Sequence, residues 1–418
     1  MATVKFHFLV AGYDYEGRGS RTGLAFGEMC TSRVKERIDF VNSHRGKPDA
    51  LVTADTTLRF LRFSFEFGKI EVMDRKFLAA KGITEKTVRE SDWKPLSSVG
   101  THDAFDPDTF VTKRPLRAVN VSADYVVGSD AHQPALKQDG TTTDIMSITD
   151  VYHAVHDAPD GSVLEVSFYS HGWVEGPILV NSSNNSANPA LRDPTDKDGR
   201  GSVDFNLTMG EPPGSVGGLV RVLGFMASFD PKGFVQGWGC NFDIEVSLIL
   251  QVNRALNRFA ARKVSVQDST VIPLEFEASR WLGRNRVVDP LPPMFFPADN
   301  ALAFSRTFGE VKKFLRHRLA RSYAFKFAAA SPSLTGFGAL PGTSGDVDVT
   351  GFRMMRVCAF LGKKNAAGKR VECNDGYEPV FRFYRNRMNV AVQDDRGYGI
   401  FDAATVQRLN AEIAAEAP

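Results

Sequence analysis

The sequence predicts a protein of the α/β class, with a mainly parallel central sheet and helices between successive strands. Two observations support this prediction. A strand-like segment at 4–11 precedes a segment of helical periodicity at 24–41, and strand-like segments at 163–170 and 234–238 alternate with helical ones at 143–156, 218–229 and 243–263. The 418 residues are 43% hydrophobic and 24% charged, which is typical of a globular protein with a sizeable core.

The N-terminal part, residues 1–265, carries the elements expected of one domain. Residues 4–11 are β-branched and aromatic and end at Gly12, which is typical of a first strand. The helix at 24–41 follows, and residues 50–54 are expected to form a short second strand. Residues 58–127 then break the alternation of strands and helices. Apolar and charged residues alternate at 59–72 and predict β structure with one solvent-exposed face. We therefore interpret 58–127 as an inserted β layer or as a hairpin layer on the main sheet.

The last part, residues 266–418, predicts a mixed α+β region that we expect to pack on the same domain. A basic helix is expected at 304–325, strands at 352–361 and 380–392, and a terminal helix at 403–416. No internal repeat and no clean linker is visible in the sequence.

Charge, cysteine spacing and the first residues narrow the class of protein. A formal net charge of +2 creates no field that would draw the chain to nucleic acid or to a membrane. The apolar runs fall far short of the ~20 residues of a membrane helix, and the start, MATVKFHFLVAGYD, lacks the features of a signal peptide. Cys30, Cys240, Cys358 and Cys373 are too widely spaced for a zinc site or a disulfide framework. We therefore expect free thiols in the cytoplasm, and chemistry that needs no metal and no organic cofactor.

Two apolar segments end in residues that can carry chemistry. Residues 163–173, VLEVSFYSHGW, lead into a His-Gly pair at His171, and residues 233–241, GFVQGWGCN, lead into a Gly-Cys pair at Cys240. Functional side chains gather at the carboxyl ends of the strands in a parallel α/β sheet. We therefore expect the two strands to be neighbours, with His171 and Cys240 at the same edge.

A histidine beside a cysteine is the pairing that a cysteine nucleophile uses. The thiolate is the attacking form, and the imidazole assists its formation and later protonates the leaving amine. The N–H groups of Gly172 and Cys240 are available to an oxyanion, which the start of a following helix would also favour. Trp173 and Trp238 adjoin the two motifs, and we interpret them as walls of a cleft.

In the blocks VLEVSFYSHG and FVQGWGC the chain resembles the caspase-like family of cysteine peptidases, which includes caspases, metacaspases, gingipains, legumain, clostripain and separase relatives. The resemblance implies a three-layer sandwich, with His171 as the catalytic histidine and Cys240 as the nucleophile. It also implies that Gly172 and Cys240 supply the amides of an oxyanion hole. The predicted function is an endopeptidase that hydrolyses a protein or peptide substrate through an acyl-enzyme. The residues after Cys240 do not continue the caspase pattern, and the separation from His171 is longer than is usual in caspases.

Other interpretations stand beside this one. A histidine after a strand is commonly structural, and free cysteine is among the most buried residue types. The chain would then be a catalytically inactive caspase-like binding or scaffold protein. A further alternative is an α/β protein that binds an acidic partner through the basic residues Lys312, Lys313, Arg316, Arg318 and Arg321. The acidic loop at 193–206 does not fit a calcium loop, because Pro194 and Phe205 take two of the positions where carboxylates are needed.

Overall fold

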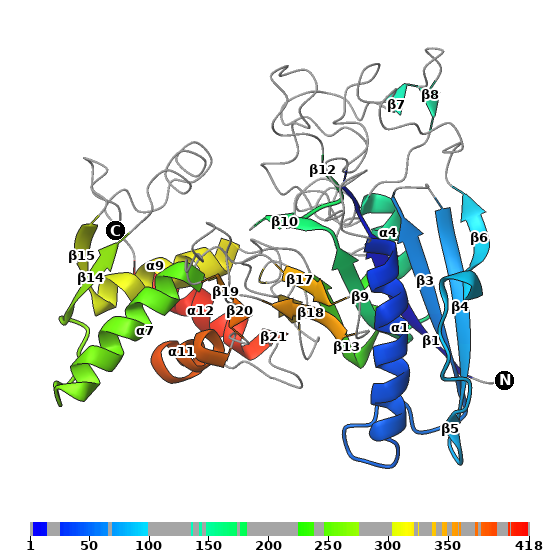
Figure 1. The fold of residues 1–418 in the computed structure, drawn as a ribbon, viewed down its shortest axis with the longest axis horizontal. Coiled ribbons are helices and arrows are strands. Elements are labelled where there is room, and N and C mark those ends of the chain that lie inside the picture. The colour runs from blue at the N-terminus through cyan, green and yellow to red at the C-terminus, as the bar shows by residue number, and fades with distance from the viewer. Residues whose placement is uncertain are drawn as a thin grey trace, which may run out of the picture.

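The computed structural model describes residues 3–14, 26–65, 69–98, 135–136, 142–143, 148–173, 176–181, 225–237, 246–275, 303–321, 325, 337–339, 345–348, 353–357, 359–360, 373–374, 378–390, 400–401 and 403–416. The centre of the fold is a nine-stranded sheet with the strand order β21-β16-β13-β9-β1-β3-β4-β5, in which β6 also pairs with β4 (Figure 1). Helices flank this sheet, so the predicted α/β class is confirmed.

The middle of the sheet is parallel. Its five parallel strands are β16 (Phe337–Ala339), β13 (Phe229–Gly237), β9 (Val163–Tyr169), β1 (Thr3–Ala11) and β3 (Thr56–Ser64). Antiparallel pairs complete both edges, with β21 (Ile400–Phe401) on β16, β4 (Lys69–Leu78) on β3, and both β5 (Gly82–Ile83) and β6 (Lys94–Ser98) on β4.

The strands β3, β4, β5 and β6 all belong to this main sheet. β3 pairs with β1 from Thr3↔Thr56 to Ala11↔Ser64, and β4 folds back on β3 as a hairpin. β3 and β4 thus form a hairpin in the main sheet, the second of the two interpretations of 58–127, and not a separate inserted layer. Residues 66–68 and 99–127 lie outside the described residues. The strand expected at 50–54 is wrong. Ala50 and Val52 are buried in an irregular connection that leads into β3, so their apolar character reflects packing and not strand pairing.

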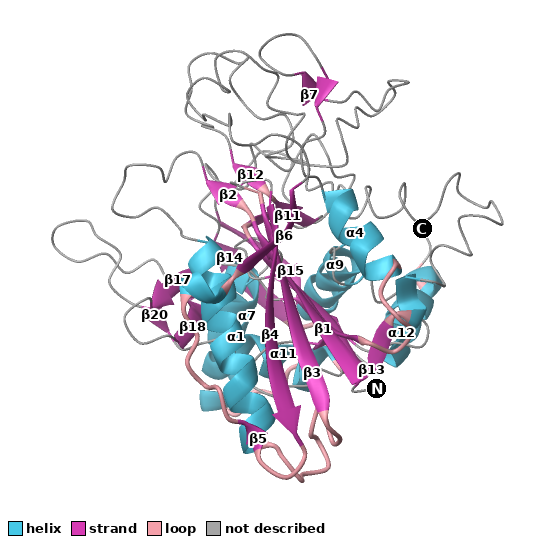
Figure 2. Cartoon of the chain, turned by 90° about the vertical axis from the view of Figure 1, so that its right-hand side faces the viewer, coloured by secondary structure: helices cyan, strands magenta, loops and turns pink. Residues whose placement is uncertain are grey.

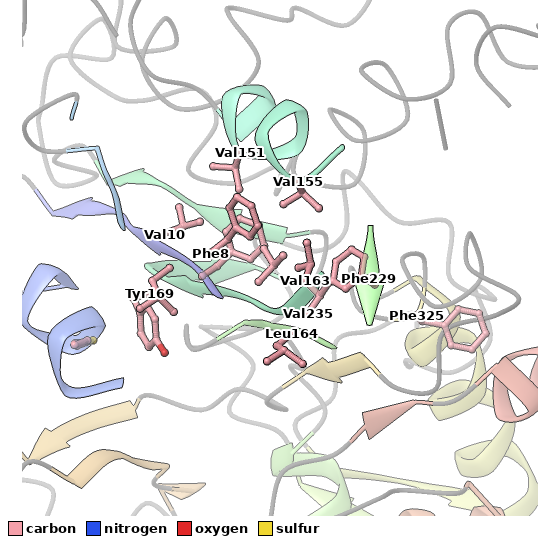
Figure 3. Packing of buried hydrophobic residues seen from close by; sticks show 14 of the residues in the cluster. Phe8, Val10, Val151, Val155, Val163, Leu164, Tyr169, Phe229, Val235 and Phe325 are labelled. Atoms are coloured by element: carbon pink, nitrogen blue, oxygen red, sulfur yellow. The ribbon is translucent and has the colours of Figure 1, made fainter. Parts of the chain in front are cut away.

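Helices cover both faces of the sheet. α1 (Phe26–Ser43) lies on one face and α4 (Ile148–His156) on the other, so the sheet is the middle of three layers (Figure 2). Val151 and Val155 of α4 point toward Phe8 of β1 (Figure 3). Because successive side chains of a strand point to opposite faces, His7 faces α1 instead. The helix predicted at 24–41 is confirmed. Of the helix predicted at 143–156, residues 148–156 are helical, residues 144–147 lie outside the described residues, and Thr143 is instead in the short strand β8 (Thr142–Thr143).

The C-terminal region combines helices with short hairpins. Its helices are α9 (Phe308–Arg321), α11 (Glu378–Met388) and α12 (Ala403–Ala415), and α7 (Val246–Ala261) directly precedes it in the sequence. The hairpins and ribbons pair β14 (Val271–Glu275) with β15 (Ala303–Thr307), β17 (Gly345–Asp348) with β18 (Arg353–Val357), and β19 (Ala359–Phe360) with β20 (Cys373–Asn374). Further toward the N-terminus, β7 (Ala135–Leu136) pairs with β8 (Thr142–Thr143), and a 3₁₀ turn η1 spans Glu90–Asp92.

α11 corrects the strand predicted at 380–392. Phe383, Tyr384 and Met388 are buried, while Arg382 and Arg385 between and beside them are exposed. Buried residues at i, i+1 and i+5 share one stripe of a helix, whereas a strand would alternate. Among the helices that the structure describes, none has the length and apolar content needed to cross a bilayer.

Candidate active site

β9 and β13, the strands that lead into the His-Gly and Gly-Cys motifs, are parallel neighbours. Their register pairs Val163 with Phe229 and Phe168 with Gly237. The expectation that these two strands lie side by side is confirmed, and both finish at the same edge of the sheet. His171 stands three positions beyond Phe168 in the sequence, and Cys240 stands three positions beyond Gly237. Residues 238–240 themselves, which include Trp238 and Cys240, lie outside the described residues.

The backbone of His171 belongs to a short hairpin at this edge. β10 (His171–Trp173) pairs antiparallel with β11 (Gly176–Ile178), so that His171 lies opposite Ile178 and Gly172 opposite Pro177. β12 (Val180–Asn181) then pairs with β2 (Tyr13–Asp14), which continues the chain after β1. Figure 1 shows β10 and β12 at the upper end of the sheet, where β9 finishes. The carboxyl edge therefore carries additional β structure around the His-Gly motif.

A close contact with Gly12 fixes the start of this hairpin. The Gly12 N–H donates to the Tyr169 carbonyl at 2.8 Å. A Cβ atom at position 12 would lie 2.7 Å from Ser170 Cβ and 3.0 Å from the Leu179 carbonyl oxygen, so no larger residue fits without movement. Glycine is used where two backbones approach this closely. The end of β1 thus packs directly against the residue that precedes His171.

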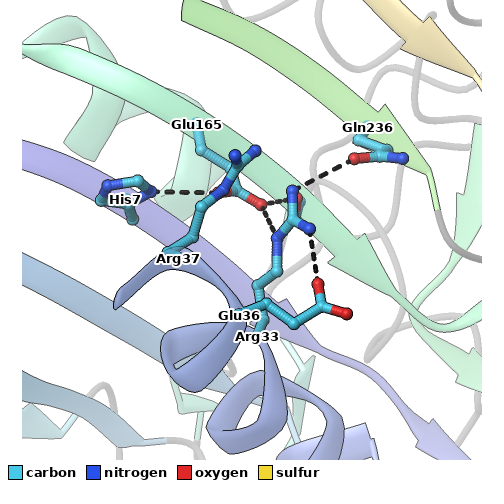
Figure 4. Close-up of polar contacts among 7 residues, drawn as sticks. His7, Arg33, Glu36, Arg37, Glu165 and Gln236 are labelled. Carbon is cyan, nitrogen blue, oxygen red and sulfur yellow. Dashed lines mark hydrogen bonds and ion pairs between the residues drawn. The ribbon is translucent and has the colours of Figure 1, made fainter. Parts of the chain in front are cut away.

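Glu165 of β9 is the centre of a buried polar cluster on the α1 face of the sheet (Figure 4). Its Oε1 accepts hydrogen bonds from Arg33 Nε at 2.7 Å and from the Ser167 hydroxyl at 2.5 Å. Its Oε2 accepts from Arg37 Nε at 2.7 Å and from His7 Nδ1 at 3.0 Å. All five residues are at most 3% exposed. Because an ionised carboxylate only accepts hydrogen bonds, His7 carries its proton on Nδ1.

Arg33 extends this cluster from β9 to β13. Its Nη1 donates to Glu36 Oε2 at 2.9 Å, and its Nη2 donates to Gln236 Oε1 on β13 at 3.5 Å. The guanidinium groups of Arg33 and Arg37 also lie over the Phe234 ring, at 5.9 and 4.6 Å from its centroid. Cations over an aromatic face are stabilised by the negative charge density of the ring. One helix therefore contacts both motif-bearing strands through charged side chains.

The charges of this cluster set its protonation states. Burial alone would raise the pKa of Glu165, but the charges of Arg33 and Arg37 and the hydrogen bond from His7 hold that pKa well below its usual value. Burial lowers the pKa of His7, and the hydrogen bond to Glu165 opposes this only in part. His7 is therefore neutral near pH 7. Two arginines then balance Glu165 and Glu36, and the cluster has no net charge.

Sequence reasoning missed this cluster, although two signals pointed to it. Glu165 interrupts an otherwise apolar strand, VLEVSFY. Arg33 and Arg37 are one helical turn apart, and each directly precedes an apolar residue of the buried stripe of α1, Val34 and Ile38. Buried charges are almost always paired. The sequence thus contains a single acidic residue within a buried strand and two basic residues beside the buried stripe of a helix. Together they indicate an ion pair between β9 and α1.

Cys30 differs from the cysteine that the motif selects. It lies on the buried face of α1 and is 0% exposed. Burial raises the pKa of its thiol well above the ordinary value, and the charge of nearby Arg62 opposes this only in part. A buried neutral thiol is a poor nucleophile. Cys30 is thus a structural residue and an internal reference for thiol reactivity.

The basic helix α9 uses much of its charge inside the protein. Lys312 pairs with Asp268 at 2.6 Å, and Arg316 forms an ion pair with Glu416 at the end of the C-terminal helix. His317 Nε2 lies 3.2 Å from the same Glu416 carboxylate, and Arg318 is only 5% exposed. Lys312, Arg316 and His317 thus pair with acidic residues of the chain itself. The structure does not describe the side chain of Arg321.

Within the described residues, no three His, Cys, Asp or Glu side chains form a group that could hold a metal ion. The acidic loop at 193–206 lies outside these residues.

Comparisons with known proteins give no further guide to the site. No protein-family model matches the chain, no curated protein matches it, and no solved structure matches its fold.

Proposed function

We propose that the protein is a cysteine endopeptidase with a caspase-like fold, in which His171 and Cys240 form the catalytic pair. The parallel pairing of β9 with β13 carries this proposal, because it brings the two strands that lead into His171 and Cys240 to one edge of the sheet. Three parallel neighbours (β13, β9 and β1) and helices on both faces supply the rigid scaffold that a loop-borne site needs.

In the proposed reaction the Cys240 thiolate attacks the carbonyl carbon of the scissile peptide bond. The N–H groups of Gly172 and Cys240 stabilise the negative charge that develops on the carbonyl oxygen. The His171 imidazolium then donates its proton to the leaving amine, and an acyl-enzyme remains on Cys240. Water deprotonated by His171 hydrolyses this thioester and regenerates the thiolate. Trp173 and Trp238 are proposed to line the cleft that holds the peptide.

Two alternatives compete with the peptidase. A caspase-like protein without catalysis, acting as a binding or scaffold protein, would share the fold but lack a reactive thiol. Binding of an acidic partner through α9 is less well supported, because Lys312, Arg316 and His317 already pair with acidic residues of the chain. We further propose a cytosolic protein or peptide as substrate, in keeping with the free thiols expected from the sequence.

Thiol reactivity separates these functions. We expect iodoacetamide to label Cys240 of the native protein at least ~10-fold faster than Cys30 at pH 7, because an activated thiolate reacts and a buried thiol does not. The label is located by mass spectrometry of tryptic peptides. His171→Ala is expected to slow labelling of Cys240. His156→Ala is the matched control, because His156 lies at the end of α4 beside Asp157 and takes no part in the proposed site.

A peptide library then tests hydrolysis directly. The wild-type protein is expected to cleave a subset of peptides, whereas Cys240→Ala should cleave none and unfold at an unchanged temperature. Slow labelling of Cys240 that His171→Ala leaves unchanged, together with no cleavage, would rule out the catalytic pair and favour the scaffold protein.

A further inference from the structure

We propose that Arg33 is a positioning residue that holds the ends of β9 and β13 in the alignment which catalysis requires. The proposal rests on the function proposed above, and it adds a residue that neither the motifs nor the resemblance identified. Arg33 lies on α1, more than a hundred residues before either motif in the sequence.

The first step of the argument is the link to β9. Arg33 Nε donates to Glu165 Oε1 at 2.7 Å, and Ser167 donates to the same oxygen at 2.5 Å. Hydrogen bonds between charged groups are short and directional. These contacts fix the orientation of the Glu165 carboxylate relative to α1. Since β9 ends at Tyr169, the anchored residues are the last stretch of strand before the His-Gly motif.

The second step is the link to β13. The same guanidinium reaches Gln236 Oε1 at 3.5 Å and lies 5.9 Å from the centre of the Phe234 ring. Phe234 is opposite Glu165 in the strand register, and Gln236 is opposite Ser167. Arg33 therefore contacts two consecutive cross-strand pairs on one face of the sheet. A sliding of β13 along β9 would break contacts to at least one of the two strands.

The third step is the position of these pairs along the strands. Gln236 precedes Gly237, the last residue of β13, and only residues 238–239 separate that strand end from Cys240. A displacement of about 1 Å between reacting groups can reduce a rate by about 100-fold, even when the mutated residue is remote. A side chain that sets the relative position of the two strand ends thus has a direct route to the rate of reaction.

Arg62 supplies a matched control. Like Arg33 it is a buried arginine, 6% exposed, whose guanidinium pairs with two glutamates, Glu71 and Glu90. It also lies over an aromatic ring, 4.6 Å from the centre of Trp93. Its hydrogen-bond partners Glu71, Glu90 and Gly27 lie on β4, η1 and α1 and not on β9 or β13. Arg62→Lys should therefore disturb a comparable network without disturbing the alignment of the two motif strands.

The test compares Arg33→Lys with Arg62→Lys in the full-length protein. Lysine keeps the positive charge but cannot contact Glu165, Glu36 and Gln236 at once, because it lacks the planar fork of arginine. Hydrogen–deuterium exchange of the amides in β9 and β13 reports whether the two strands keep their protection from solvent. The rate of Cys240 labelling by iodoacetamide, and kcat and KM on a cleaved peptide, report the site. We expect Arg33→Lys alone to speed exchange of residues 234–237 at least ~10-fold and to lower kcat ~10–100-fold with little change in KM.

Two outcomes would overturn the proposal. One is equal exchange of residues 234–237 in the two variants, and the other is an equal loss of kcat. Gln236→Leu provides a second route if Arg33→Lys folds poorly, because it removes the hydrogen bond from Arg33 to β13 and leaves Arg33 paired with Glu165. It should reproduce the loss of kcat and of protection in β13. If wild-type Cys240 neither labels selectively nor supports cleavage, the proposed function fails, and the exchange comparison still decides whether Arg33 ties the strands.

Discussion

Replacing Glu165 with glutamine is predicted to lower the free energy of unfolding by about 3–5 kcal/mol, because its buried carboxylate forms ion pairs with two buried arginines. Glutamine keeps the size of the side chain, so packing changes little. It removes the negative charge, and its NH2 group must face either the donors Arg33 and Ser167 or the donors Arg37 and His7.

The magnitude follows from these contacts. A hydrogen bond to a charged group contributes about 1.5–3 kcal/mol to stability, and Glu165 accepts two such bonds from arginines. Glu36, 2.9 Å from Arg33, still neutralises one guanidinium in the variant, which leaves about one uncompensated positive charge in the cluster. The two charged hydrogen bonds from arginines therefore set a scale of about 3–6 kcal/mol. The carbonyl oxygen of glutamine still accepts a neutral hydrogen bond, so we expect a loss in the lower part of this range.

Urea unfolding at pH 7, followed by tryptophan fluorescence and circular dichroism, measures this loss. Asp74→Asn is the control, since it makes the same chemical change in an exposed pair. Arg59 and Asp74 form two hydrogen bonds of 2.9 and 2.7 Å, but both side chains are 40% exposed. Exposed pairs contribute about 0–1 kcal/mol, so the control should scarcely shift the midpoint. A Glu165→Gln midpoint as close to wild type as that of Asp74→Asn would refute the electrostatic reasoning.

Two further predictions concern acid stability and the β1 edge. Below about pH 6.5 an unfolded histidine binds a proton that folded His7 does not, since burial lowers the pKa of His7. The free energy of unfolding therefore falls as the pH drops. His7→Phe should reduce the slope of this free energy against pH by up to about 1.4 kcal/mol per pH unit, measured by urea unfolding from pH 7 to 5. An unchanged slope would contradict a neutral His7. Gly12→Ala should cost about 1–3 kcal/mol and slow Cys240 labelling, because its Cβ would lie 2.7 Å from Ser170 Cβ. Wild-type stability and labelling in this variant would show that the backbone around Ser170 can move to accommodate a Cβ atom at position 12.

Local periodicity predicted the elements whose core face can be read from neighbouring residues. β1, α1, β9, α7 and the terminal helix α12 lie where their apolar patterns indicated. The pattern was misleading where burial had another cause. Residues 380–392 alternate apolar and charged residues over a few positions, but the buried side chains of Phe383, Tyr384 and Met388 follow a helical stripe. Residues 50–54 are apolar because the connection between α1 and β3 is itself partly buried.

Local periodicity could not predict which elements meet across long sequence separations. The expectation that β9 and β13 are neighbours came from two motifs that need each other chemically, and the register confirms it. Arg33 and Glu165 are 132 positions apart, and no local pattern says which of many acids an arginine meets. The same holds for β3, whose alternating sequence predicted β structure but not a place beside β1 in the main sheet.

The position of β1 between β3 and β9 has a consequence for the order of folding during synthesis. One edge of β1 pairs with β3, which begins at Thr56, about 50 residues later in the chain. The other edge pairs with β9, which begins only at Val163. At about 5–20 residues per second, the ribosome needs roughly 5–20 s to add that second partner after the first. Through this interval the growing chain presents an unpaired apolar strand, which invites pairing with other chains. A chaperone that shields the β1 edge should therefore improve the yield of folded protein more than one that acts after chain release.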